Sequence, residues 1–299
     1  MNDYEKTKIV HNYSEFSPFK FNDKIISIME EIYNRTIILS NLDYSMREIS
    51  SKDVLNIGKD YLNSKFILHS IPYLSTENRK NIENSSKINP NVLCQLYSKK
   101  IDPFKIPVEF VYGDYFAGDL VLGYDFSDEL KVLKKMKIYF EKIYLSKVQS
   151  IINSSSYVHE IVHTQIERKG AIIDSNNSEA LSIFMELVFL NDLDSDSLLA
   201  YVGLLSRISY MIASYNLLIK NNDPTDIVSN YSNTKYFVST AKAIALFDKY
   251  INSSTLIRSE IINNIQSIFD GDMIVDNFLN YFDATVEKGL EFIKDMRFM

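Results

Sequence analysis

The amino-acid sequence predicts a mainly α-helical, multi-helical fold with a small β-hairpin or sheet before its central helices. Only 8 glycines and 6 prolines occur in 299 residues, so the chain has few residues that break helices. Long segments rich in Ile, Leu, Lys, Glu and Asn favour helices packed on helices over a β-sandwich. Residues 106–123 alone combine Val, Phe and Tyr with glycines, as strands and turns do.

The first third of the chain is expected to be helical. Helical periodicity starts at Phe19 and runs to residue 40. A second helix is expected after Ser50, because Ser50 and Asp53 have the spacing of a capping box. Asn89 and Pro90 fit the cap and the first position of a short helix.

Residues 106–123 are expected to form the β-hairpin or small sheet. Their sequence is IPVEFVYGDYFAGDLVLG, in which Gly113 and Gly118 are placed as turn residues. Ser127 is then placed to cap a helix over residues 128–149.

The remaining residues are expected to form a series of helices. Ser154, Ser155 and Ser156 are candidate N-caps of the first, and Gly170 is placed to end it. Asn177 or Ser178 is expected to cap the next helix. Further helices are expected at residues 197–220, 233–251, 254–269 and 275–299.

The chain is long enough for one large domain or two modest ones. The change of composition near residue 105 predicts an N-terminal helical lobe over 1–105 and a second lobe over 106–299, unless the two form a single domain.

Composition and charge exclude several classes of protein. The net charge of −7 disfavours a nucleic-acid partner, which needs a basic surface. The polar N-terminus lacks the apolar segment of a secretory signal, and no apolar run is long enough for a membrane span, so membrane insertion is not expected. The single cysteine, Cys94, allows no intrachain disulfide. These features predict a cytoplasmic protein.

Residues 159–163, with the sequence HEIVH, carry the strongest chemical signal. His159 and His163 lie one helical turn apart, so both imidazoles can reach one Zn²⁺. Glu160 can take a proton from zinc-bound water and pass it to a leaving amine. The motif therefore predicts a zinc-dependent hydrolase and makes residues 106–299 the catalytic lobe.

A catalytic zinc site needs a third protein ligand, and no histidine follows His163, so a carboxylate must serve. Glu179 is the favoured candidate, 16 positions later (179 − 163), because the short loop should fold its helix back on the first. Glu186, seven positions further on (186 − 179), is either an alternative ligand or a partner that holds a histidine N–H. Glu167 fits a solvated charge at a helix end.

These residues resemble the gluzincin metallopeptidases, in which a glutamate on the following helix completes the HExxH site. The chain is most similar to the thimet-oligopeptidase and oligoendopeptidase F family. The similar segments are VHEIVHTQIE at 158–167, SEALSIFMELV at 178–188 and, less closely, NTKYFVSTAKAIALFDKY at 233–250. The resemblance implies a helical zinc peptidase whose last segment bears a tyrosine at the site. Tyr231 and Tyr236 are the candidates for an oxyanion donor.

The chain also departs from that family. Its gap between His163 and Glu179 is shorter, Val162 stands where a glycine is usual, and the family's downstream histidine is missing. The chain is also shorter than those enzymes, so the resemblance implies a divergent and compact relative.

The predicted function is hydrolysis of peptide bonds in peptides or unfolded segments, with Zn²⁺ as cofactor and Glu160 as the base. The strands expected within 106–123 offer an edge along which an extended peptide substrate can pair. Two alternatives stay open: a protein that binds metal without catalysis, and a helical peptide-binding or interaction protein without metal. The sequence does not specify an oligomeric state.

Overall fold

The computed structural model describes ten segments of the chain. They are residues 19–36, 48–49, 51–68, 108–113, 120–126, 133–141, 149–167, 175–193, 198–220 and 227–296. These segments are mainly helical, which confirms the predicted fold class at that level. The short helix predicted at Asn89 and the environment of Cys94 lie outside them.

The chain divides into two compact units. Unit 1 comprises Met1–Ser14 and Met46–Ile173, and unit 2 comprises Glu15–Ser45 and Asp174–Met299. The HEIVH motif belongs to unit 1, whereas Glu179 and Glu186 belong to unit 2. The boundary predicted near residue 105 lies outside the described segments, so the division into lobes 1–105 and 106–299 stays a prediction.

Unit 1 contains two described helices and five described strands. Helix α3 (Ser51–Lys65) packs on helix α6 (Ile151–Glu167), and the helix predicted after Ser50 is thereby confirmed. The strands are β1 (Glu48–Ile49), β2 (Val108–Gly113), β3 (Leu120–Phe126), β4 (Leu133–Glu141) and β5 (Gln149–Ser150). β1 pairs with β5 in antiparallel fashion, and β5 runs directly into α6.

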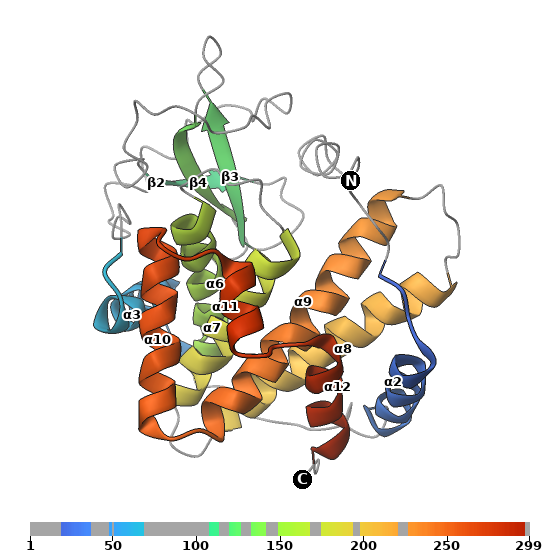
Figure 1. Ribbon diagram of the computed structural model, residues 1–299. Helices are drawn as coiled ribbons and strands as arrows, with labels where there is room; N and C mark the ends of the chain where they lie inside the picture. Colours follow the sequence, from blue (N-terminus) through green and yellow to red (C-terminus); the bar gives the residue numbers. More distant parts are fainter. Residues whose placement is uncertain are drawn as a thin grey trace. The chain divides into compact units, whose positions relative to one another are not determined.

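The order of the strands differs from the predicted hairpin. β4 lies between β2 and β3, parallel to β2 and antiparallel to β3 (Figure 1). β2 and β3 therefore do not pair with each other. Of the two forms expected for residues 106–123, the hairpin is not shown, and the strands belong instead to a small sheet.

The helix predicted over 128–149 is wrong for residues 133–141, which form β4. The sequence of this segment alternates Met136, Ile138 and Phe140 with Lys135 and Lys137, a period of two that suits a strand. Its lysines also fit a helical face, which is the feature that favoured a helix. Pairing with both β2 and β3 decides between the two conformations.

Helix α6 starts earlier than expected. Because it begins at Ile151, Ser154, Ser155 and Ser156 lie inside the helix, and the prediction that one of them caps it is wrong. The helix ends at Glu167, and Gly170 lies outside the described residues.

Unit 2 is built from helices in its described part. They are α2 (Asp23–Thr36), α7 (Ser175–Leu193), α8 (Leu198–Lys220), α9 (Ile227–Ile251), α10 (Thr255–Asp270), α11 (Val275–Tyr281) and α12 (Val286–Asp295). The helices predicted at 197–220 and 254–269 are confirmed. The helix predicted at 233–251 begins earlier, and α7 begins before Asn177 and Ser178, so neither residue is its N-cap.

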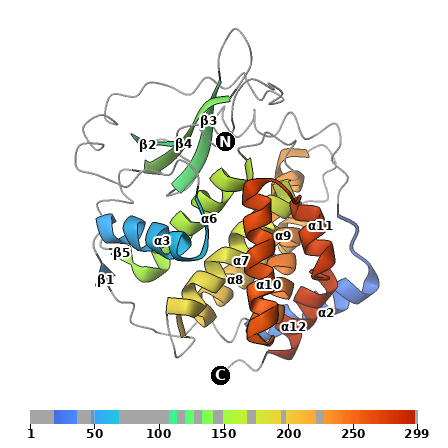
Figure 2. The same cartoon turned by 60° about the vertical axis from the view of Figure 1, so that its left-hand side comes forward.

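Helix α7 lies at the centre of unit 2. It packs against α8, α9 and α11 (Figure 1), and a second view shows α7, α8 and α9 side by side (Figure 2). Every residue from Ala180 to Leu190 is buried, as expected for a helix that is apolar around its whole circumference. Any charged side chain on α7 must therefore find a partner inside the protein.

Helix α9 connects most of the other helices of unit 2. Its 25 residues contact α7, α8, α10 and α12. Near its middle, Phe237 joins an aromatic cluster with Phe19, Phe21 and Tyr215, in which the ring centroids lie 5.2–5.9 Å apart. This cluster ties the residues before α2 to α8 and α9.

Among the described residues, no helix has both the length and the apolar character needed to cross a membrane.

The crossing of α9 and α12 depends on a glycine. A Cβ atom at Gly289 would overlap the carbonyl group of Ala241, so the two backbones pack too closely for a side chain. Replacement of Gly289 by alanine must therefore push the two helices apart.

We predict that Gly289→Ala lowers the free energy of unfolding by about 3 kcal/mol, because overpacking at a backbone contact has few ways to relax. Urea denaturation followed by circular dichroism measures the change. Lys288→Ala, at an exposed neighbouring position on α12, is the matched control and should have little effect. Equal stability of Gly289→Ala and the wild type would contradict this reading of the crossing.

Candidate metal centre

Helix α6 places the two histidines of the motif on one face. Its apolar residues Tyr157, Val158, Ile161 and Val162 are all buried. The histidine side chains are buried as well, with 7% of His159 and 8% of His163 exposed. Two imidazoles in such a position are costly unless they have polar partners.

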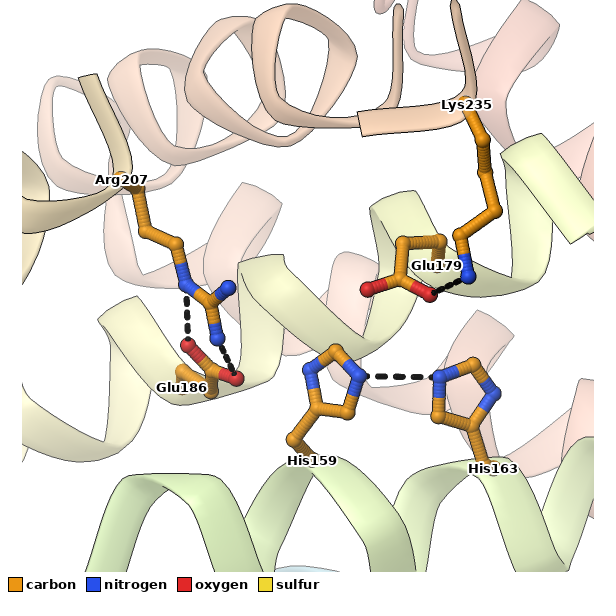
Figure 3. A network of polar contacts seen from close by, with 6 residues as sticks. All are labelled: His159, His163, Glu179, Glu186, Arg207 and Lys235. Atoms are coloured by element: carbon orange, nitrogen blue, oxygen red, sulfur yellow. Dashed lines mark hydrogen bonds and ion pairs between the residues drawn. The ribbon is translucent and has the colours of Figure 1, made fainter. Parts of the chain in front are cut away.

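The two imidazoles face each other through their Nε2 atoms, which lie 3.0 Å apart (Figure 3). Two Zn–N bonds of about 2.0–2.1 Å at a tetrahedral angle place their nitrogens about 3.3 Å apart. The histidine pair therefore needs only a small adjustment to hold one metal ion. Without a metal, one imidazole can donate Nε2–H to the other.

Glu160 lies beside His159 on α6 and is partly exposed, in contrast to the two histidines. Next to His163, the Thr164 hydroxyl donates to the backbone carbonyl of Ile161 over 2.6 Å, and the Gln165 amide donates to the Thr164 hydroxyl over 2.9 Å. These two buried side chains are satisfied near their own helix. The partial exposure of Glu160, in contrast, would let a base at this position reach a substrate and water.

In unit 2, Glu179 lies in the second turn of α7 and is 4% exposed. Its Oε2 atom lies 2.6 Å from Nζ of Lys235 on α9 (Figure 3). The ammonium group supplies the opposite charge that a buried carboxylate requires.

Glu186, two turns further along α7, has a different arrangement. Both of its carboxylate oxygens accept from the guanidinium of Arg207 on α8 (Figure 3), with Nε donating to Oε2 over 2.8 Å and Nη2 donating to Oε1. Burial opposes the charge of Arg207, but the charge and hydrogen bonds of Glu186, together with the nearby Glu179 and Tyr236, outweigh it, so the pKa of Arg207 lies above its ordinary value. Glu186 is thus held in a two-bond ion pair.

The start of α7 is anchored separately. The buried side chain of Asn177 donates to the carboxylate of Asp276 on α11 and accepts from Nζ of Lys242 on α9 over 2.7 Å. Asn177 therefore fixes the first turn of α7 between two other helices, two residues before Glu179. This role replaces the capping role predicted for it.

The two tyrosine candidates both lie on α9 and are partly exposed. The ring of Tyr236 lies beneath Nζ of Lys235, 4.7 Å from its centroid, and forms an edge-on contact with Tyr210 at 5.0 Å. Burial, followed by the proximity of Tyr236, raises the pKa of Tyr210. Tyr236 therefore borders the Lys235–Glu179 pair, whereas Tyr231 lies five positions earlier (236 − 231) on the helix. An oxyanion role for either residue stays a prediction.

The predictions from sequence did not include Lys235 and Arg207, which hold the two carboxylates of α7. Arg207 gave a usable signal, because it is the one charged residue of α8 before Lys220. A lone charge in an apolar helix requires an opposite charge inside the protein, and so does Glu186 in its own apolar helix. The two residues could therefore have been matched from the sequence. Lys235 gave no comparable signal, since α9 carries several charges.

The described residues thus contain a histidine pair within unit 1, and two buried carboxylates, each with its own cation, within unit 2.

Comparison of the chain with protein-family models gives no match, and neither does comparison with curated proteins or with solved structures.

We predict that Arg207→Met lowers the free energy of unfolding by about 3 kcal/mol, because it leaves Glu186 as a buried charge without its ion pair. The double variant Glu186→Met/Arg207→Met should recover most of this loss, since it removes both charges. Thermal or urea unfolding of the two variants measures the difference.

Lys288→Met removes one partner of an exposed ion pair with Asp283 and serves as the control, for which little change is expected. If the double variant were as unstable as Arg207→Met alone, the cost would lie in lost packing and not in the unpaired carboxylate.

Proposed function

We propose that the protein is a zinc-dependent metallopeptidase in which His159, His163 and Glu179 hold the metal ion. The observation that carries the proposal is the buried contact of 3.0 Å between the two Nε2 atoms of an HExxH motif. A second observation supports it: His159, His163 and Glu179 are all buried, and each offers one atom of a type that binds a metal ion.

The donor set fits zinc. Two imidazole nitrogens and one carboxylate oxygen are the ligands of a hydrolytic zinc site that keeps a position open for water or substrate. A structural zinc site would instead have four protein ligands, commonly with thiolates. The chain has a single cysteine, which makes a thiolate-rich site impossible within one chain.

The environment of the two carboxylates favours Glu179 over Glu186 as the third ligand. Glu186 gives both oxygens to Arg207, so binding a metal would require it to leave a buried two-bond ion pair. Glu179 is bonded to Lys235 through Oε2, and monodentate metal binding requires one carboxylate oxygen. The alternative prediction that Glu186 is the ligand is therefore not part of this proposal.

A bound zinc ion would supply a Lewis acid that acidifies water and polarises the carbonyl of the scissile bond. Glu160, beside the first histidine and partly exposed, would accept a proton from the attacking water and return it to the leaving amine. Tyr236 and Tyr231 are the proposed donors to the oxyanion that forms on the carbonyl. The tyrosine roles follow the resemblance to the oligopeptidase family.

The proposed substrates are peptides or unfolded segments, which is the substrate class of the peptidases that the sequence resembles. The small sheet that precedes α6 is the proposed recognition element, because a strand edge can pair with an extended chain. The proposed location is the cytoplasm, which fits a chain with one cysteine.

We predict that the chain purified after growth with zinc holds about one zinc ion per molecule and that His163→Ala loses it, since two remaining ligands hold zinc weakly. Elemental analysis of both proteins, after removal of loosely bound metal, gives the metal content. His69→Ala, which changes a histidine outside the motif, should keep the metal. Zinc absent from the wild type, even after zinc is supplied, would leave a helical interaction protein without metal as the function.

We predict that Glu160→Gln keeps the zinc but lowers the rate of peptide hydrolysis by about 10²–10⁴-fold, because the amide cannot take up the proton of water. A library of quenched fluorescent peptides measures the rate. Glu167→Gln, which changes the other acidic residue of α6, is the matched control and should keep the activity. A wild type that binds zinc but cleaves no peptide would favour the catalytically silent metal-binding protein.

A further inference from the structure

We propose that Lys235 is a positioning residue for the metal ligand Glu179: it holds the carboxylate in the orientation that binds the metal and so increases metal affinity. This inference rests on the proposed function, because it concerns the third ligand of the same site. It starts from the contrast between the two buried carboxylates of α7, each of which has a cation from a different helix.

The two carboxylates are held in different ways. Arg207 engages both oxygens of Glu186 and so fixes the plane of its carboxylate. Lys235 carries a compact charge that contacts Glu179 at Oε2, 2.6 Å from Nζ. A carboxylate offers about four lone-pair sites, so Glu179 can accept from Lys235 and bind a metal ion at the same time.

The position of Lys235 is itself constrained. Its side chain is 13% exposed, and its Nζ atom lies over the ring of Tyr236, 4.7 Å from the centroid. Helix α9, which carries both residues, packs along α7, which carries Glu179. The ammonium group is therefore held between the face of an aromatic ring and a carboxylate. It is less mobile than the end of a lysine side chain that extends into water.

A fixed cation next to Glu179 has a defined effect on metal binding. A glutamate side chain has three rotatable bonds, and a ligand that must be ordered upon binding reduces the affinity. Hydrogen-bond partners of metal-ligating carboxylates remove that cost in advance, and their loss lowers metal affinity by about 10–100-fold. Lys235 is placed to be such a partner.

The test is the zinc affinity of the full-length chain, measured by competition with a chromophoric chelator. Lys235→Met, which keeps much of the side chain but removes the ammonium group, should bind zinc at least about tenfold more weakly than the wild type. Lys235→Arg, which keeps a cation near Glu179, should recover most of the affinity. Lys249→Met is the matched control, because Lys249 also lies on α9 but bonds to the carbonyl of Phe282. The zinc affinity of Lys249→Met should equal that of the wild type.

A double-mutant cycle separates positioning from a general effect on the fold. Glu179→Ala alone should weaken zinc binding, and Lys235→Met should cause no further loss in the Glu179→Ala background, because Lys235 acts through that carboxylate. A merely structural role of Lys235 would lower the affinity in both backgrounds. Circular dichroism establishes that each variant is folded. If Lys235→Met does not fold, Lys235→Gln, which keeps a hydrogen-bond donor, takes its place with the same expected direction.

Each remaining outcome decides a different question. If Lys235→Met binds zinc as tightly as the wild type, or more tightly, Lys235 does not position the ligand, and the inference is overturned while the metal site stands. If the wild type binds no zinc, the proposed function itself fails, and this inference fails with it.

Discussion

Helix α7 carries Glu179 and Glu186 into an interior where every residue from Ala180 to Leu190 is buried. A carboxylate in such surroundings is tolerated only when a cation or a metal ion compensates its charge. Unit 2 meets this requirement with one cation from each of two neighbouring helices, Arg207 from α8 and Lys235 from α9. The charges of α7 are therefore compensated only when α8 and α9 pack against it.

Helix α9 links α7 to other helices of unit 2. The ion pair with Glu179 fixes one part of the helix beside α7, and Lys242 bonds to Asn177 at the first turn of the same helix. Helix α9 also meets α12 at Gly289, where the two backbones leave no room for a side chain. A shift of α9 would disturb the polar contacts and the close backbone crossing together, so its position has little freedom.

The fold was predictable from sequence where a segment has one dominant signal. The long apolar segments of α8 and α10 predict helices at nearly the observed bounds, because their apolar periodicity has no competing interpretation. Residues 133–141 gave two signals, a lysine pattern that fits a helix and an alternation that fits a strand. Pairing with β2 and β3 decided in favour of the strand, and β2 is not adjacent to this segment in the sequence. The strand order β2-β4-β3 could not be inferred, since no local pattern encodes which strand lies between the other two.

For the candidate site, the sequence by itself determined the histidine pair, because residues one turn apart on a helix share a face whatever surrounds them. His159 and His163 accordingly have adjacent Nε2 atoms. The sequence favoured Glu179 as the ligand, but only the tertiary structure gave the two carboxylates of α7 their different partners. Their spacing places Glu179 and Glu186 on one face, but the partner of each comes from another helix, and the sequence around the two glutamates does not specify which helix packs there. The ion pairs of Arg207 with Glu186 and of Lys235 with Glu179 are thus decided by how α8 and α9 pack on α7.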